Sequence, residues 1–321
     1  MDPRTIANQY YDAWRHRAGD MSGVPLAPDF VFTGPVASFD NAEAFRAMTR
    51  QAGAAVRRFE VRHQFTEGDL VCSVIDWEMA MLPGTLTAAE VLQVRNGTLV
   101  RGELIYDAQE LREAIDADPV ALLDRSLTDT ADMFTRVPAD AWQTLSPCAG
   151  WTARHVGNHL VGSIALLTRV ALREPVDPAE FDAHKLAKTD HLGPDPASSL
   201  REAAQRCVAA FARPGTLHAR YSFPGPDTPG AVIAHICLLE SLVHGWDVAH
   251  ATGAAYRPAD AAIAAVQRFA LLAVGPEQRA QGLFAAVVPV APDADRLTAT
   301  LAHLGRRARP TRPGNGVDVQ R

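Results

Sequence analysis

The most apolar long segment of the chain reads PGAVIAHICLLESLVHGWDVAHATG, residues 229–253. Drawn as a helix, it carries apolar side chains around almost its whole circumference, which predicts a helix buried in the core of a domain and ended by Gly253. At about 100° per residue, Glu240 and His244 lie about 40° apart on this helix, and Asp247 falls on the same stripe. Buried carboxylates are costly without a partner, so this stripe requires a cation, an arginine or a metal ion beside it.

A second predicted helix, residues 153–173, offers a partner for that stripe. It follows Thr152, a favourable N-cap, and carries His159 among apolar neighbours. Facing helices of a bundle can direct Glu and His side chains inward, and His159, Glu240 and His244 would leave the fourth position of a divalent metal open. Zinc suits such a site, and nickel, iron and manganese also fit it. A hydrogen-bonded core network without a metal is the alternative that the spacing leaves open.

The C-terminal part of the chain, residues 117–308, is predicted to form a four-helix bundle with a further helix. The predicted helices are 119–136, 153–173, 197–213, 230–252 and 258–274. Residues 174–196 are rich in loop-forming residues and are predicted as a loop. The tail from Arg306 is rich in Pro, Gly and Arg and is predicted to be unstructured, with residues 309–321 outside the domain.

Residues 1–112 show a different periodicity. Tyr10 and Trp14 recur at helical spacing, and a second helical segment follows a short apolar strand. Strand-like runs separated by turn residues come next, and the hairpin dipeptide Asn96-Gly97 precedes the last of them. Helices followed by a run of antiparallel strands predict an α+β domain whose sheet curls over the helices.

Two carboxylates of this part are candidate acid/base groups. Asp76 shares one strand face with Glu78, and Asp107 ends the last predicted strand. If Asp76 or Asp107 points into an apolar cone, desolvation raises its pKa and suits it to proton transfer. Asp107 has an alternative role as the cap of the helix that follows. Other residues that could line such a pocket, each more often structural than catalytic, are Tyr10, Trp14, His63 and Glu90.

The composition excludes several classes of protein. A length of 321 residues suggests two domains, and 47% hydrophobic with 21% charged residues is ordinary for soluble globular chains. Thirty-one Lys and Arg against 37 Asp and Glu give a net charge of −6, which disfavours a nucleic-acid partner.

The four cysteines are widely spaced and predict neither a disulfide framework nor a cysteine zinc site. No signal-peptide pattern and no run of about 18 apolar residues occurs, so a cytoplasmic protein without a membrane partner is expected.

Two motifs resemble the DinB-like family, and within it the N-terminal domain of mycothiol-dependent maleylpyruvate isomerases. They are SPCAGWTARHVGNHLVG at 146–162 and LESLVHGWDVAHATG at 239–253. The resemblance covers about residues 117–308 and implies a four-helix bundle that binds a divalent metal through His159, Glu240 and His244. It implies that Asp247 orients a ligand rather than binding the metal, and that mycothiol is a candidate cofactor. Those isomerases carry a C-terminal extra domain, whereas here the extra domain is N-terminal. The resemblance therefore supports metal binding by this chain more strongly than it supports the isomerisation named for the family.

The N-terminal part resembles the SnoaL-like branch of the NTF2-like superfamily. The resemblance rests on YYDAW at 10–14, LAPDFVFTGPV at 26–36 and VRNGTLVRGELIYD at 94–107. It implies an α+β cone with a deep apolar pocket, a proton-transferring Asp for which Asp107 is the best match, and a homodimer formed through this domain.

Three functions are consistent with these features. The first is a metal-dependent enzyme of small-molecule metabolism, natural products included, that performs isomerisation or thiol addition or transfer in the bundle. The second is a polyketide-type cyclase or isomerase that works by acid/base catalysis in the N-terminal pocket, with the bundle structural. The third is a protein that binds a small metabolite without catalysis.

Overall fold

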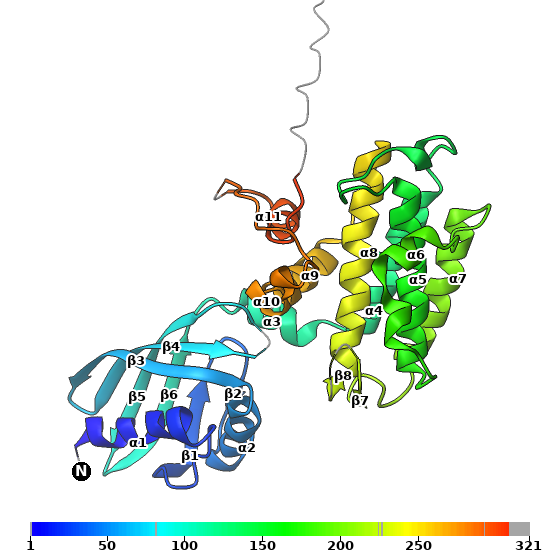
Figure 1. Ribbon diagram of the computed structural model, residues 1–321. Coiled ribbons are helices and arrows are strands. Elements are labelled where there is room, and N and C mark those ends of the chain that lie inside the picture. The colour runs from blue at the N-terminus through cyan, green and yellow to red at the C-terminus, as the bar shows by residue number, and fades with distance from the viewer. Residues whose placement is uncertain (1, 81, 224, 226, 292, 308–321) are drawn as a thin grey trace, which may run out of the picture. The chain divides into compact units, whose positions relative to one another are not determined.

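The computed structural model describes residues 2–80, 82–223, 225, 227–291 and 293–307 (Figure 1). The chain divides into two units, Met1–Asp116 and Ala117–Arg321. The unstructured tail predicted at residues 309–321 lies outside the described residues.

In the described part of the N-terminal unit, six strands form one mixed sheet in the order β2-β1-β6-β5-β4-β3. Strand β1 is parallel to β6, and all other neighbours are antiparallel. The strands are β1 (Leu26–Thr33), β2 (Ser38–Phe39), β3 (Val56–Glu67), β4 (Leu70–Met79), β5 (Leu86–Arg95) and β6 (Thr98–Ile105). The helices are α1 (Pro3–His16), α2 (Ala42–Gly53) and α3 (Gln109–Asp116).

Alternating side chains place one face of this sheet in a core. In β4, Ile75 and Trp77 are buried, whereas Asp76 and Glu78 are directed to the other face. Helix α1 packs against β3, β4 and β5, and α2 packs against β1. The α+β cone predicted for this part of the chain is confirmed.

Strand β3 lies at one end of the sheet and, among the described residues, pairs with β4 alone. Its register with β4 shifts between Val56 and Arg58 and again between Val61 and His63. The exposed charged side chains of β3 include Arg57, Arg58, Glu60 and Arg62. This edge of the sheet is therefore bulged and highly charged.

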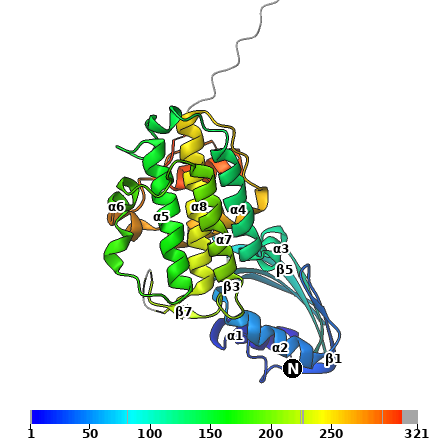
Figure 2. The ribbon, with the colours of Figure 1, turned by 90° about the vertical axis from the view of Figure 1, so that its right-hand side faces the viewer.

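The C-terminal unit is helical, and its four longest helices lie side by side (Figure 2). They are α4 (Pro119–Phe134), α5 (Ala153–Ala171), α7 (Pro196–Phe211) and α8 (Gly230–Thr252). The shorter elements are η1 (Ala141–Gln143), η2 (Pro178–Phe181), α6 (Ala183–Lys188), β7 (Arg220–Tyr221), β8 (Thr228–Pro229), α9 (Asp260–Ala273), α10 (Pro276–Ala280) and α11 (Arg296–His303). The predicted four-helix bundle with a further helix is confirmed.

One predicted loop is wrong in part. Residues 174–196 contain η2 and α6, which begin behind the N-caps Asp177 and Asp182. Each of these Asp side chains accepts hydrogen bonds from backbone N–H groups of the first turn, which stabilises a short helix in a segment interrupted by proline.

Helix α8 occupies the core of the bundle. Among the described helices it alone is long and apolar enough to span a membrane by length and composition, with a mean hydropathy of 1.3. It packs against α4, α5 and α9, and 61% of its most apolar window is buried. Its apolar composition is that of the core helix of a soluble domain. Gly253 ends α8 with φ of 74°, as the sequence predicts.

Gly245 allows α8 to approach α4 closely. A Cβ at this position would lie 2.8 Å from Thr130 Oγ1 and 2.9 Å from Tyr256 Oη. These two oxygens are hydrogen bonded at 3.0 Å, so neither moves away without breaking that bond. We expect Gly245→Ala to lower the free energy of unfolding of this unit by about 1–3 kcal/mol in urea denaturation. The control is Gly225→Ala, whose Cβ meets no atom within 4 Å, and an equal loss there would contradict the prediction.

Candidate metal centre

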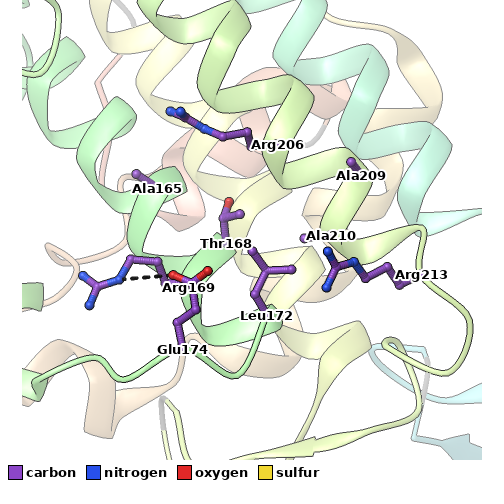
Figure 3. A pocket seen from close by; sticks show the side chains of 9 residues that line it. All are labelled: Ala165, Thr168, Arg169, Leu172, Glu174, Arg206, Ala209, Ala210 and Arg213. Carbon is purple, nitrogen blue, oxygen red and sulfur yellow. Dashed lines mark ion pairs between the residues drawn. The ribbon is translucent and has the colours of Figure 1, made fainter.

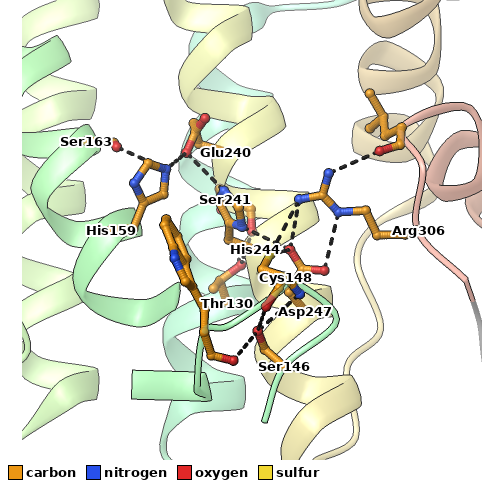
Figure 4. Close-up of polar contacts among 12 residues, drawn as sticks. Thr130, Ser146, Cys148, His159, Ser163, Glu240, Ser241, His244, Asp247 and Arg306 are labelled. Carbon is orange, nitrogen blue, oxygen red and sulfur yellow. Dashed lines mark hydrogen bonds and ion pairs between the residues drawn. The ribbon is translucent and has the colours of Figure 1, made fainter. Parts of the chain in front are cut away.

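Helices α5 and α8 supply the predicted ligands from adjacent positions in the bundle. Thr152 caps α5, and its hydroxyl and backbone N–H both contact His155. This capping box fixes where α5 begins, so His159, one turn further along, faces α8. Glu240 and His244 follow each other at one-turn spacing on α8 and point toward His159 (Figure 4).

The three predicted ligands converge on one point. Glu240 Oε2 lies 3.2 Å from His159 Nε2 and 3.4 Å from His244 Nε2. One potential ligand atom from each side chain lies within 4.8 Å of the other two. The two imidazole rings stand edge to face, with ring centroids 5.0 Å apart. The sequence predicted this meeting of side chains, and the structure brings them together.

Two buried polar atoms of this cluster have no hydrogen-bond partner among the described residues: Glu240 Oε2 and His159 Nδ1. The two short contacts of Glu240 Oε2 therefore lack the alignment of a hydrogen bond. Buried carboxylate oxygens are rarely left in this state, because the loss of hydration is costly. Two nitrogens and an oxygen around one point are a donor set that suits a divalent cation, so the residues fit a metal ion.

Asp247 orients one of the imidazoles. Its Oδ2 lies 2.9 Å from His244 Nδ1, and this hydrogen bond assigns a proton to Nδ1. The lone pair of Nε2 in the neutral ring then faces Glu240 and His159. A carboxylate behind a ligating histidine commonly has this role in metal sites, and Asp247 holds the position that the sequence predicted for it.

When no metal is bound, charges within the cluster control its protonation. Burial alone would raise the pKa of Glu240, but the charge of His244 and the nearby His159 hold it well below its usual range. Burial alone would lower the pKa of His244, but the charge of Glu240 and the hydrogen bond to Asp247 raise it. Because a ligating imidazole must release its proton, metal affinity is expected to fall as the pH falls.

Two residues that the sequence did not single out complete the surroundings of Asp247. Arg306 Nη2 donates to Asp247 Oδ2 at 3.1 Å, and the Cys148 thiol donates to the same oxygen at 3.3 Å. Asp247 is fully buried, which alone would raise its pKa, but Arg306 and His244 lower that pKa to about 2. The unstructured tail was predicted to begin at Arg306, and for Arg306 this prediction is wrong, because its guanidinium is hydrogen bonded to the carboxylate of Asp247.

A separate hollow of about 480 Å³ lies between α5 and α7 (Figure 3). Its lining includes Arg206, Arg213 and the ion pair between Arg169 and Glu174, whose closest charged atoms are 3.8 Å apart. None of the metal-site residues lines it, so it is not part of the candidate centre.

The two predicted acids of the N-terminal unit do not point into its core. Asp107 is exposed, and its Oδ1 accepts a hydrogen bond from Gln109 N at 3.0 Å, so it caps α3 as its alternative role predicted. Asp76 accepts from Thr87 Oγ1 at 2.6 Å and lies 3.6 Å from Arg62 on the face of β4 opposite the core. The condition for their predicted acid/base role, desolvation inside the cone, is therefore not met. Glu90 of β5 is the carboxylate that points inward, with 2% of its surface exposed.

Comparisons with known families agree with this division of the chain. The mycothiol maleylpyruvate isomerase N-terminal domain matches residues 123–249, and the SnoaL-like domain matches residues 7–102. Together the two domains point to an enzyme of small-molecule isomerase or cyclase type. The family of the C-terminal unit is metal-binding and mycothiol-related.

Similar proteins occur in Mycobacterium tuberculosis. The chain is 31% identical to the uncharacterised protein Rv0738 over 197 residues, which is 60% of this chain and 100% of that protein. It is 30% identical to the uncharacterised protein Rv0036c over 164 residues, which is 44% of this chain and 60% of that protein.

Similar solved structures cover about a third of the chain. An NTF2-like protein of unknown function from Cytophaga hutchinsonii shares 18% identity at a TM-score of 0.31 and covers 35% of this chain and 96% of that one. An LEH-like epoxide hydrolase of M. tuberculosis shares 14% identity at a TM-score of 0.30 and covers 35% of this chain and 87% of that one. From its sequence matches, the chain belongs to the mycothiol maleylpyruvate isomerase N-terminal-domain family through its C-terminal unit, to which a SnoaL-like domain is joined at the N-terminal side.

Proposed function

We propose that the C-terminal unit is a metal-dependent enzyme that isomerises a small unsaturated or carbonyl compound, or adds or transfers a thiol to it. His159, Glu240 and His244 are its proposed metal ligands. The observation that carries this proposal is the position of Glu240 Oε2, which lies between Nε2 of both histidines without an aligned hydrogen-bond donor. A hydrogen-bonded core network is expected to give that oxygen at least one well-aligned donor.

The donor set favours zinc, and nickel, iron or manganese are the alternatives. A divalent metal bound there supplies a Lewis acid that polarises a carbonyl oxygen or lowers the pKa of a thiol or water molecule. Mycothiol, the thiol in the name of the family, is the proposed cosubstrate. The proposed setting is the cytoplasm, with a small molecule as substrate.

The protein residues around the ligands have separable roles. Asp247 keeps a proton on His244 Nδ1, so that Nε2 stays available as a ligand. Arg306 balances the charge of Asp247 and holds that carboxylate in place through two hydrogen bonds. Trp151 packs against His159 with ring centroids 5.3 Å apart and restricts the rotation of that imidazole.

Metal content measured by mass spectrometry tests the proposal. After dialysis against zinc and then against metal-free buffer, the parent chain is expected to retain about one equivalent. His159→Ala and Glu240→Gln are each expected to bind zinc at least about tenfold more weakly, because a three-ligand site loses one ligand. The control is His218→Ala, which removes an exposed imidazole of the same unit. Equal zinc in all four proteins, or none in the parent chain, would contradict the assignment.

Activity is the second readout. Maleylpyruvate with mycothiol is the first reaction to assay, since both compounds stand in the family name. Turnover that is lost with a chelator, restored by zinc and absent from Glu240→Gln would support the proposed function. Turnover that persists after complete removal of metal would overturn the metal-dependent mechanism.

A further inference from the structure

The hollow between α5 and α7 lies apart from the candidate metal centre and is lined by one stripe of each helix. On α7 the stripe is Arg206, Ala209, Ala210 and Arg213, at positions i, i+3, i+4 and i+7. Arg213 follows the C-cap Ala212, and its backbone N–H still donates to Ala210 O, so the helical turn extends to it. Side chains seven residues apart share one helix face and lie about 10 Å apart along the axis. This stripe therefore has an arginine at each end and small side chains between them.

The opposite wall comes from α5 and is mostly apolar. It consists of Ala165, Thr168, Arg169 and Leu172, which again follow the i, i+3, i+4, i+7 spacing. The hydroxyl of Thr168 donates to Ile164 O at 2.7 Å, so the wall has no unpaired hydroxyl proton. Alanines on both helices leave open the space that larger side chains would fill. The hollow of about 480 Å³ is within the usual range for a small-molecule site.

The three arginines around the hollow differ in how they are paired (Figure 3). Arg169 lies 3.8 Å from Glu174 and 2.8 Å from Glu180, so two carboxylates balance its charge. Arg206 and Arg213 form no hydrogen bond or ion pair with any residue that the structure describes. Two guanidinium groups at the ends of the α7 stripe are therefore available to a ligand.

Nearby carboxylates do not neutralise these two groups. Glu202 precedes Arg206 by one turn, which is the spacing of a helical ion pair, yet no ion pair joins them in the described structure. Glu174 is the one acid among the lining residues, and it is held by Arg169. The hollow thus carries an excess of positive charge in a chain whose net charge is −6. This local excess favours an anionic ligand.

We propose that the hollow between α5 and α7 binds a linear dicarboxylate. One carboxylate pairs with Arg206 and the other with Arg213, because a guanidinium can donate two parallel hydrogen bonds to a carboxylate. The apolar middle of the ligand lies over Ala209 and Leu172, where it displaces water from apolar surface. The site selects for length as well as charge, since the two arginines are two helical turns apart.

Calorimetric titration of the full chain with suberate, a linear dicarboxylate, tests this site at low ionic strength. The parent chain is expected to bind it with a Kd of about 1 mM or lower. Octanoate has the same chain length but one carboxylate, and it is expected to bind at least about fivefold more weakly, because one guanidinium stays unpaired. Physiological salt is expected to weaken suberate binding, since both arginines are exposed.

Variants separate the contribution of charge from that of shape. Arg206→Gln and Arg213→Gln each remove one guanidinium and are each expected to bind suberate at least about fivefold more weakly. Ala209→Leu keeps both arginines, fills the hollow and is expected to abolish binding. All three side chains are exposed, so the variants are expected to keep the fold, which circular dichroism checks. Arg201→Gln is the matched control, because it makes the same charge change on α7 outside the hollow and is expected to bind suberate like the parent chain.

Several results would overturn the proposal. One is the absence of binding by the parent chain at about 10 mM suberate. Others are undiminished binding in Arg206→Gln, Arg213→Gln or Ala209→Leu, or an equal affinity for octanoate. An equal loss in Arg201→Gln would indicate general attraction to positive charge rather than a site.

A carboxylate can also bind a metal ion, so the metal centre needs its own control. Chelator-treated Glu240→Gln is expected to bind suberate like the parent chain, because none of the proposed metal ligands lines the hollow. Loss of binding in this protein would assign suberate to the metal centre and overturn the proposal.

Discussion

An Asp247→Asn variant is expected to lose about 3–5 kcal/mol of unfolding free energy. The carboxylate has no exposed surface and accepts hydrogen bonds from His244 Nδ1 at 2.9 Å, Arg306 Nη2 at 3.1 Å and Cys148 Sγ at 3.3 Å. A neutral amide leaves the guanidinium of Arg306, whose side chain is 15% exposed, without an opposite charge. Hydrogen exchange of α8 amides in the presence of chelator measures this loss without a contribution from metal.

The same contact predicts how stability depends on pH. The folded-state pKa of Asp247, about 2, lies below the unfolded value of about 3.9. The stabilisation is therefore present above about pH 4 and is lost as the pH falls through about 2. The Asn variant is expected to lack this acid-dependent loss.

Asp132→Asn is the matched control for the first prediction. Asp132 also pairs with an arginine, Arg201 at 3.0 Å, but its side chain is 55% exposed. Surface pairs of this kind contribute less than about 1 kcal/mol. An equal loss in the two variants would show that the burial of Asp247 is not what makes its contacts important.

Glu90→Gln is expected to stabilise the N-terminal unit at alkaline pH by about 3 kcal/mol. Burial raises the folded-state pKa of Glu90 from 4.5 to about 7, so the folded unit prefers the protonated acid. The contribution of the parent carboxyl is fully present below about pH 4.5 and is lost as the pH rises through about 7. Gln cannot ionise and can still accept the hydrogen bond of Tyr10. Hydrogen exchange of β5 amides between pH 5 and pH 9 measures the difference, after correction for intrinsic exchange rates.

Glu78→Gln controls for a general effect of charge in the same sheet. Its carboxylate lies on the outer face of β4 and contacts Arg58 at 3.1 Å, with 36% of the side chain exposed. This variant keeps Glu90 and is therefore expected to lose stability with rising pH to the same extent as the parent chain. The prediction for Glu90 fails if the parent chain and Glu90→Gln lose stability in parallel as the pH rises.

The sequence predicted the cluster of His159, Glu240 and His244 because the positions of these residues follow the helical period. Glu240 and His244 share a stripe of α8 that follows from helical spacing. His159 was a candidate from its apolar neighbours on the second predicted helix, and the resemblance to a metal-binding family implied the same three residues. Arg306 lies 59 residues from Asp247 in the chain, and no local pattern connects the two. The buried carboxylates of α8 predicted a positively charged partner. That Arg306 is this partner for Asp247 could be seen only in the structure.

Among the acids of the N-terminal unit, neighbours in the sequence explain the role of Asp107 but not the contacts of Glu90. Asp107 lies just before α3, and its exposed carboxylate accepts a hydrogen bond from the backbone N–H of Gln109 in the first turn. Glu90 alternates with Ala88 and Leu92, so its sequence position already predicted an inward side chain on a strand with one buried face. Whether that side chain was paired could not be predicted, because Tyr10 and Tyr11 meet it from α1, some 80 residues earlier in the chain.

The charged and twice-bulged strand β3 bears on how this protein behaves when it is concentrated. A sheet edge exposes unpaired backbone groups onto which another chain can add, and this is the route by which many β proteins form fibrils. Arginines and a glutamate along β3, together with its two register shifts, interrupt the flat ladder that such addition needs. The folded chain is therefore expected to resist the addition of another strand at that edge.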